Sequence, residues 1–247
     1  MTEHEQLMYH VLGKISESNA PIVFKGALIT KLILAENGYT AAERMTRDID
    51  ANWVDIPPSM PVLAEAVNKS LESIDDMLHA EPIREYGEGK SAGIAIINTA
   101  TGDRIISMDI TIKPVIGSRV YHYGEVGIRG VLASEILADK ISVLSKQIMF
   151  RRAKDLVDVY ALAHCINVQT TEIFDVLKRK SAVVGEFSEL FTRRGDVEHA
   201  YNKLKRMENK PLFDDVYSYL TQFIQPFAQK DETPRIWNSD ILTWEEP

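Results

Sequence analysis

The sequence has little cysteine and no long apolar run. Its 247 residues contain a single cysteine, Cys165, so no internal disulfide can form and no zinc knuckle can be built from thiolates. This cysteine usage suits a reducing cytosol, and we expect a cytoplasmic location. Residues 1–18 are polar and periodic and lack the apolar core of a signal peptide. Since no apolar run approaches the roughly 20 residues that span a bilayer, we expect no membrane partner.

Positive charge is also in short supply. The chain carries 28 Lys and Arg against 36 Asp and Glu, a formal net charge of −8, which argues against a protein that coats nucleic acid without specificity. The distribution is uneven, because residues 140–206 hold thirteen Lys and Arg and eight Asp and Glu. This stretch could hold an anionic ligand, or its basic residues could simply line solvated helix faces.

Hydrophobic spacing predicts a mixed α+β first half and an all-helical second half. We expect an α+β domain over residues 1–130 and a helical domain over 131–247 that completes an active-site cleft. Expected strands are 21–24 and 47–53 with a hairpin over 93–112, and expected helices are 4–18, 27–34, 61–80, 133–148, 153–165, 170–180, 196–207 and 211–229. Ser134 is expected to cap its helix, and Trp237 and Trp244 should pack the tail onto the body.

Two aspartates stand where a buried strand is expected, in "MTRDID". Side chains alternate along a strand, so Thr46, Asp48 and Asp50 should share one face. The two aspartates then lie roughly 6–7 Å apart at the backbone and can converge on a pair of hard cations. Mg²⁺ suits such a site, because it takes a few carboxylates plus water and phosphate oxygens. A pair of this kind can also mark no more than a strand edge or a turn.

A third carboxylate and an anion-binding turn accompany this pair. In "RIISMDITI", Asp109 falls on the polar face of a later strand. In "FKGALITKL", a strand, Lys25-Gly26 and a helix follow one another, which places free backbone N–H groups and a helix N-terminus at one point, as phosphate binding favours. The Walker A pattern is absent. Alternatively, Gly26 only permits a tight turn and Lys25 points to solvent.

The helical half adds a further polar set. Asp155 and Asp158, at i and i+3, should share one helix face. Lys140 lies on a helix whose apolar positions pack inward, and Lys140 and Asp155 could form a plain interhelical salt bridge. We expect Lys140 and Asp155 to face the cleft of the strand aspartates.

Taken together, these blocks resemble the AbiEii/AbiGii toxin family of nucleotidyltransferases, in the polymerase-β-like superfamily. The matching blocks, over residues 24–162, are "FKGALITKL", "RMTRDIDANW", "SMDITI", "LADKISVL" and "RRAKDLVDVYAL". The resemblance implies a polymerase-β-like nucleotidyltransferase domain with a mixed sheet, followed by a C-terminal helical domain. Ala27 replaces the second glycine that the family usually has at its phosphate turn, and Lys154 stands where the family often has arginine.

The resemblance also implies roles for individual residues. The implied metal ligands are Asp48, Asp50 and Asp109, and the implied catalytic set adds Lys140 and Asp155. The implied nucleotide contacts are Lys25, Gly26, Ala27, Thr46, Lys140 and Asp158.

The function that this resemblance implies is Mg²⁺-dependent transfer of a nucleoside monophosphate from an NTP onto RNA, with the tRNA 3′ end as the leading acceptor. The biology implied is that of a toxin paired with a cognate antitoxin protein, or of phage abortive infection. Two alternatives remain open: a small-molecule nucleotidyltransferase of the aminoglycoside-modifying kind, whose cationic acceptor an acidic surface suits, and a catalytically quiet member of the fold that binds a nucleotide or a partner.

Overall fold

The computed structural model describes residues 2–40, 46–87, 91–146, 152–205, 207 and 209–247. Arg44, Met45 and Arg151, which belong to the quoted motifs, lie outside these residues. The chain divides into two compact units. The first comprises Met1–Leu32 and Thr46–Leu132, and the second comprises Ile33–Met45 and Ala133–Pro247.

The first unit is built on a mixed β-sheet. Its elements are α1 (Glu3–Glu17), β1 (Ile22–Lys25), the start of α2 (Gly26–Glu36), β2 (Asp48–Trp53), α3 (Met60–Leu71), β3 (Leu78–Arg84), β4 (Ser91–Asn98), β5 (Arg104–Thr111), β6 (Ser118–Tyr123) and β7 (Val126–Val131). Within the described residues, seven strands pair in the order β3-β4-β5-β2-β1-β7-β6. The β2–β5 and β1–β7 pairs are parallel, and the other neighbours are antiparallel.

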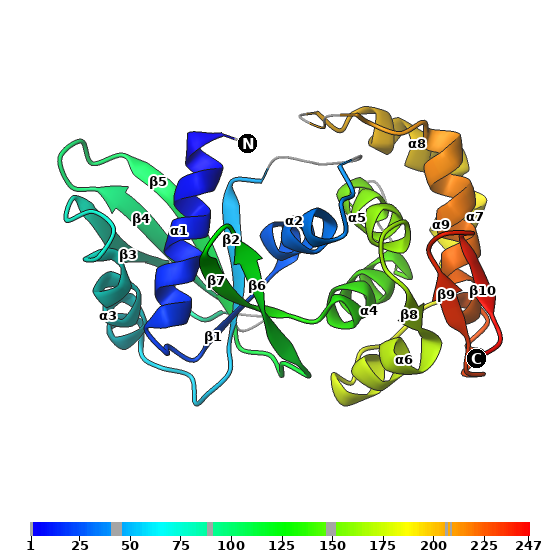
Figure 1. The fold of residues 1–247 in the computed structure, drawn as a ribbon, viewed down its shortest axis with the longest axis horizontal. Coiled ribbons are helices and arrows are strands. Elements are labelled where there is room, and N and C mark those ends of the chain that lie inside the picture. The colour runs from blue at the N-terminus through cyan, green and yellow to red at the C-terminus, as the bar shows by residue number, and fades with distance from the viewer. Residues whose placement is uncertain (1, 41–45, 88–90, 147–151, 206, 208) are drawn as a thin grey trace. The chain divides into compact units, whose positions relative to one another are not determined.

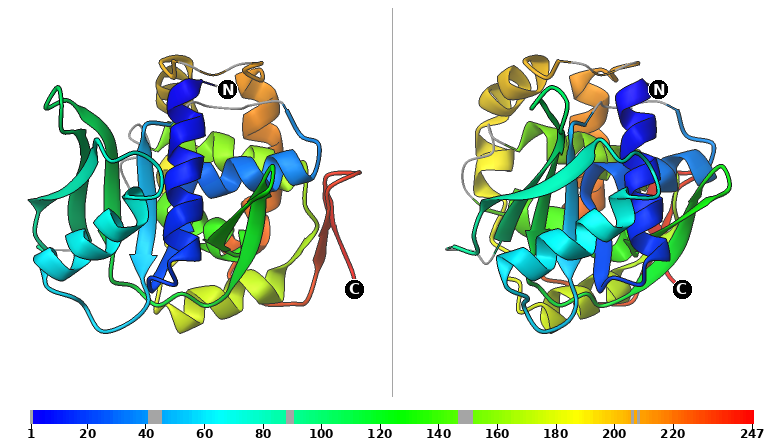
Figure 2. Two further views of the ribbon diagram at one scale, coloured as in Figure 1. Left: turned by 60° about the vertical axis from the view of Figure 1, so that its left-hand side comes forward. Right: turned by 90° about the vertical axis from the view of Figure 1, so that its left-hand side faces the viewer.

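Two helices cover the apolar face of this sheet. α1 packs on β7, α3 packs on β3, and the two helices contact one another along one side of the sheet (Figure 1, Figure 2). α1 begins with a capping box, in which Thr2 and Glu5 each accept a hydrogen bond from the other's backbone N–H. α3 is tied to edge strand β3 by the Asn68 side-chain amide, which donates to the carbonyl of Ala80 at 3.0 Å and accepts from its N–H at 2.6 Å. Asn68 thus satisfies backbone groups that an edge strand would leave unpaired.

The alternation of β2 and β5 separates an apolar face from a polar one. Ile49 and Ala51 of β2 are fully buried, and Met108 and Ile110 of β5 are no more than 1% exposed. In the parallel pairing, Ile49 lies opposite Met108 and Ala51 opposite Ile110, so these four side chains share the covered face. The intervening side chains, including Asp48, Asp50 and Asp109, therefore belong to the other face.

The second unit is mainly helical. Its elements after the end of α2 are α4 (Ala133–Leu144), α5 (Ala153–Ala163), β8 (Val168–Gln169), α6 (Thr170–Arg179), α7 (Ser188–Thr192), α8 (Arg194–Asn202), α9 (Phe213–Ala228), β9 (Ile236–Asn238) and β10 (Thr243–Glu245). In the part of this unit that the structure describes, three short strands pair in the order β10-β9-β8. Trp237 of β9 is fully buried, and its indole N–H donates to the carbonyl of Ala163 at 2.7 Å. Trp244 donates to the carbonyl of Phe223 at 3.1 Å, so the tail does pack onto the body as expected.

Several sequence-based expectations are wrong in detail. The helix expected over 61–80 ends at Leu71, because the Asp75 carboxylate accepts a hydrogen bond from the N–H of Met77 at 2.9 Å and forms a turn, after which β3 begins. Ser134 lies inside α4, which begins at Ala133, so it is not the residue that precedes the helix. Strands β3, β6 and β7, and the small sheet β8–β10, were not predicted.

The α+β class, the mixed sheet and the hairpin of β4 and β5 are present as expected. Among the helices that the described residues form, none combines the length and hydropathy that a bilayer crossing needs.

Candidate functional site

A row of polar side chains crosses the face of the sheet opposite the apolar face that packs against α1 and α3. Asp50 on β2 lies opposite Lys25 on β1 in the antiparallel pairing and opposite Asp109 on β5 in the parallel pairing. Paired residues on neighbouring strands direct their side chains to the same face, at a strand spacing of about 4.8 Å. The structure therefore brings together three of the residues that the sequence singled out.

Gly26 adjoins this row because its backbone and its surroundings both require glycine. Its φ of +71° lies in the left-handed region, which side chains other than glycine occupy at a cost. A Cβ atom at this position would also lie 2.9 Å from Cβ of Asp50 and 3.0 Å from its Cγ. Gly26 thus lets the Asp50 carboxylate approach the backbone at the first residue of α2. If Gly26 only permitted a tight turn, its close approach to the Asp50 side chain would be left unexplained.

Lys25 organises the next row of the same face. Its ammonium group donates to the side-chain oxygen of Asn52 and to the hydroxyl of Thr111, both at 2.6 Å. The Thr111 hydroxyl also bonds the side chain of Asn52. Lys25 therefore does not simply point to solvent. Asn52 continues the i, i+2 pattern of Asp48 and Asp50, which was the signal in the sequence that could have identified it.

Asp109 is held by an arginine that sequence reasoning did not identify. Nη2 of Arg84 donates to Oδ1 of Asp109 at 2.6 Å and to Oγ of Ser91 at 3.3 Å. The Arg84 side chain crosses β4 above Gly93, which pairs with Arg84 on one side and with Asp109 on the other. Arg84 was missed because β3 was expected to be part of a helix and a loop.

The remaining nucleotide-site candidates of this unit flank the row. Asp48 is exposed at the start of β2, opposite Ser107 of β5. Thr46 precedes the strand and is partly buried, and its hydroxyl lies 3.4 Å from the carbonyl oxygen of Asp48. Ala27 is 7% exposed in the first turn of α2. Because Thr46 lies outside β2, the strand alternation that placed it with Asp48 and Asp50 does not extend to it.

The polar face suits a hard cation through two of its carboxylates. Within the described part of the chain, no group of three or more His, Cys, Asp and Glu side chains is arranged to hold a metal ion. Asp48 and Asp50 are two residues apart on one face, with Gly26 leaving space beside Asp50. Mg²⁺ commonly binds through one or two carboxylates, with water and phosphate oxygens completing its octahedron. These two residues therefore fit such an ion, whereas assignment of Asp109 as a ligand stays a prediction.

The second unit contains a buried cluster made by Lys140 of α4 with Asp155 and Asp158 of α5. The Lys140 ammonium donates to Oδ1 of Asp155 at 2.9 Å and to Oδ2 of Asp158 at 2.6 Å. The three residues are 9%, 8% and 4% exposed, respectively. The interhelical salt bridge that the sequence allowed is therefore formed, and it includes both aspartates.

The two carboxylates set the protonation of Lys140. Burial lowers the pKa of Lys140, but the carboxylates of Asp158 and Asp155 outweigh this effect and hold the pKa above its ordinary value. Oδ2 of Asp155 is buried and, among the described residues, accepts no hydrogen bond, and Nη1 of Arg152 lies 3.8 Å away, within ion-pair distance. Lys140 is therefore a protonated ammonium that two carboxylates already hold.

Cys165 is not a candidate nucleophile. Burial raises the pKa of its thiol to about 12, so the thiol stays protonated at neutral pH. A cysteine nucleophile has to be a thiolate.

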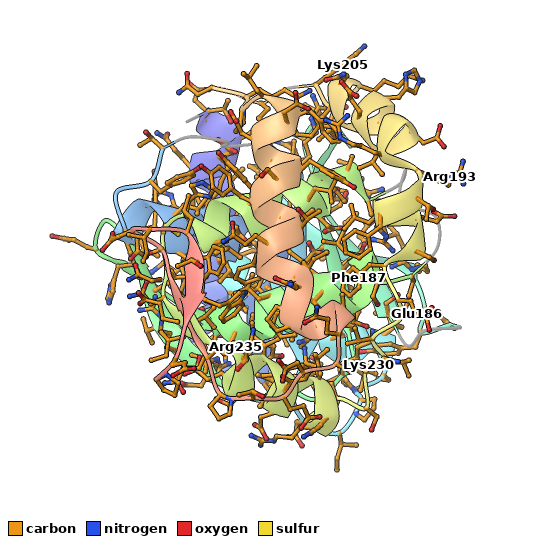
Figure 3. The ribbon with its side chains drawn as sticks, turned by 90° about the vertical axis from the view of Figure 1, so that its right-hand side faces the viewer. Glu186, Phe187, Arg193, Lys205, Lys230 and Arg235 are labelled. Carbon is orange, nitrogen blue, oxygen red and sulfur yellow. The ribbon has the colours of Figure 1, made fainter. Side chains whose placement is uncertain are left out.

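The basic residues of the second unit, including the local excess over residues 140–206, are spread out and many of them are ion-paired. Arg193 and Lys205 lie near α8, whereas Lys230 and Arg235 lie near the other end of α9 (Figure 3). The Arg193 guanidinium bonds Asp196 at 2.8 Å and Glu189 at 3.4 Å. Arg235 bonds Asp231 at 2.6 Å. These pairs favour the view that basic residues here line solvated helix faces.

Known proteins resemble the chain in sequence family and in fold. The family model described as nucleotidyl transferase AbiEii toxin, of a type IV toxin–antitoxin system, matches residues 7–240. No curated protein matches the chain. The crystal structure of JHP933 from Helicobacter pylori aligns with a TM-score of 0.57 at 15% identity, covering 93% of this chain and 94% of that one. MenT4, a nucleotidyltransferase toxin from Mycobacterium tuberculosis, aligns with a TM-score of 0.44 at 12% identity, covering 97% and 92%.

The family match spans nearly the whole chain and includes the strand aspartates, the Gly26 turn and the Lys140 cluster. The likeness to JHP933 agrees with the fold. The chain is therefore a nucleotidyltransferase and belongs to the AbiEii family of nucleotidyl transferase toxins.

Proposed function

We propose that this chain transfers a nucleoside monophosphate from an NTP onto the 3′ end of tRNA and releases pyrophosphate, acting as a toxin that a cognate antitoxin protein restrains. Membership of a toxin family of type IV toxin–antitoxin systems supports the toxin role. The observation that carries the site is the placement of Asp48 and Asp50 on the polar face of the sheet, beside the glycine that begins α2.

The polar face has the groups that a bound NTP requires. Asp48 and Asp50 would hold Mg²⁺, which when bound neutralises triphosphate charge and lowers the pKa of an attacking hydroxyl. The free backbone N–H groups at the start of α2, from Gly26 and Ala27, are suited to a phosphate oxygen. Thr46, just before β2, is a further candidate nucleotide contact.

Lys25 has a positioning role in this proposal. Its ammonium already bonds Asn52 and Thr111, so it fixes the polar row next to Asp50. A fixed row keeps the carboxylates oriented before substrate binds, and such preorganisation lowers the cost of reaching the transition state.

Lys140, Asp155 and Asp158 have a different task. Asp155 and Asp158 keep Lys140 protonated and leave it one N–H for a substrate oxygen. Because two carboxylates already hold its ammonium, we propose that Lys140 contributes a directed hydrogen bond and that neutralisation of the triphosphate rests on the metal and the α2 N-terminus.

The acceptor is the least constrained part of the proposal. RNA as acceptor is supported by the family resemblance, while the net charge of −8 and the ion-paired arginines of the second unit leave few phosphate contacts. Because the salt dependence of nucleic-acid binding scales with the number of phosphate contacts, we expect weak RNA binding whose affinity falls only shallowly with salt.

A small cationic acceptor is the second candidate, because the acidic total charge favours it. A catalytically quiet, nucleotide-binding role is the third, because Ala27 replaces the family's second glycine at the phosphate turn.

One experiment separates these functions. The chain is incubated at low salt with Mg²⁺, each labelled NTP in turn, and either total tRNA or an aminoglycoside. The proposal expects label in tRNA from at least one NTP, and a growth defect when the chain is expressed without its antitoxin. Label in the aminoglycoside alone would establish the second candidate. Nucleotide binding without label in either acceptor would establish the third.

A further inference from the structure

Arg84 and Asp109 form an ion pair at the edge of the carboxylate face, and their geometry bears on what Asp109 does. Arg84 lies on β3, Asp109 on β5, and β4 runs between them. Gly93 of β4 is the residue in register with both. A Cβ atom on Gly93 would lie 3.2 Å from Cβ of Arg84, which is a tight contact. Because glycine has no side chain, the Arg84 side chain can pass over this position to reach Asp109.

A local irregularity in β3 directs Arg84 to this face. The pairing of β3 with β4 shifts register between Pro82 and Arg84. Such bulges turn a strand and re-aim its side chains, and they are frequent next to active sites. As a result, the Arg84 guanidinium comes to the side of the sheet that carries Asp48 and Asp50 and reaches Asp109 on β5, two strands from β3.

The ion pair is too exposed to serve mainly as a stabilising contact. The Arg84 and Asp109 side chains are 54% and 51% exposed. Ion pairs at this exposure contribute little to folding stability. The guanidinium has five N–H groups, and within the described residues its bonds, to Asp109 and Ser91, both come from Nη2, so a planar donor edge remains that matches phosphate oxygens.

We propose that Asp109 positions Arg84 for the polyphosphate of the NTP, and that Asp109 is not a metal ligand. The inference rests on the proposed function of the same face. In this arrangement Asp48 and Asp50 hold the metal alone, and Asp109 keeps the guanidinium pointed across Gly93. Arg84 thereby places positive charge beside Asp109, the carboxylate that was expected to be the third metal ligand.

The test compares metal binding with nucleotide binding in purified variants. The metal probe is Mn²⁺, followed by its electron paramagnetic resonance signal, and the nucleotide probe is a non-hydrolysable NTP analogue, followed by calorimetry. The variants are Arg84→Ala, Arg84→Lys, Asp109→Asn, the double variant Arg84→Ala/Asp109→Asn, and Asp48→Asn. Arg104→Ala is the matched control, because Arg104 is an exposed arginine of β5 that bonds the Ser107 hydroxyl and no carboxylate.

The proposal gives a distinctive pattern. Asp109→Asn should leave Mn²⁺ affinity within about twofold of wild type, while Asp48→Asn weakens it at least about tenfold. Arg84→Ala and Asp109→Asn should each weaken analogue binding by about tenfold, and the double variant by no more than that, because both remove one unit. Arg84→Lys should recover part of the loss, and Arg104→Ala should match wild type. All variants should unfold at the wild-type temperature.

Other results would overturn the proposal. If Asp109→Asn weakens Mn²⁺ binding as much as Asp48→Asn, Asp109 is a metal ligand. If Arg84→Ala binds the analogue as wild type does, Arg84 has no role in phosphate binding. In both cases wild type still binds Mn²⁺ and the analogue, so the proposed function stands. A wild-type chain that binds neither probe would overturn the proposed function and this inference with it.

Discussion

Each unit contains a pair of aspartates on one face of an element, and the two pairs differ in burial. On the sheet of the first unit, Asp48 is exposed and Asp50 is partly buried, on a face that α1 and α3 leave uncovered. In the second unit, Asp155 and Asp158 are buried and share the ammonium of Lys140. One pair of carboxylates is at least partly exposed, and the other is buried with a cation of its own.

This difference in burial separates carboxylates that can bind a ligand from carboxylates that stabilise the fold. A solvated carboxylate keeps its hydration and can give it up to a metal, so its removal costs the fold little. A buried carboxylate without its cation suffers the full desolvation penalty. We therefore expect substitutions in the sheet cluster to change activity and substitutions in the helical cluster to change stability first.

The largest effect on stability is expected for Lys140→Ala. This change leaves two buried aspartates without their shared cation, and such losses typically cost about 3–5 kcal/mol. Urea unfolding followed by circular dichroism measures the difference. Arg152→Ala is a control, because the Arg152 side chain is about half exposed and its Nη1 makes only a long contact with Oδ2 of Asp155, at 3.8 Å. Equal stability of Lys140→Ala and wild type would show that the cluster does not depend on its lysine.

Gly26→Ala should have the next largest effect, and it bears on the sheet cluster. An alanine at a left-handed φ costs about 1–2 kcal/mol, and the new methyl group would displace the Asp50 carboxylate. We expect this loss of stability together with a fall in nucleotide transfer. Gly38→Ala has the same backbone strain, at φ +68°, with no atom within 4 Å of the added Cβ. If both variants retain equal activity, the contact between Gly26 and Asp50 is not functional.

Asp155→Asn should be milder than Lys140→Ala. Oδ1 would still accept from Lys140, and the cluster would lose one negative charge. We expect a change in the free energy of unfolding of no more than about 1 kcal/mol. A loss as large as that of Lys140→Ala would mean that both carboxylate charges are required to hold the ammonium.

The pH dependence of stability should show the smallest effect. The raised pKa of Lys140 means that its contribution is fully present below the ordinary lysine value of about 10.5. The contribution is lost as the pH rises through the higher pKa of the folded state. Unfolding of wild type and Lys140→Ala between pH 8 and pH 11.5 should therefore give free energies that converge at the alkaline end. A constant difference would contradict the assignment.

The sequence predicted what depends on local pattern and missed what depends on pairing between distant segments. Alternation along the chain placed Asp48 with Asp50, and helical spacing placed Asp155 with Asp158. The strand β3 was hidden by its continuity with an apparently helical run, so Arg84 could not be assigned to the face. The bonds of Lys25 to Asn52 and Thr111 join three strands, and only the sheet order brings those strands together.

The central claim is that the open carboxylate face carries the transfer chemistry, and Asp48→Ala tests it most directly. The measurement is the rate of label transfer from the preferred NTP to tRNA, per folded molecule, beside wild type and the Arg104→Ala control. Loss of a metal-binding carboxylate should lower this rate by about a thousandfold while the unfolding temperature stays unchanged. Transfer at the wild-type rate by Asp48→Ala would contradict the account.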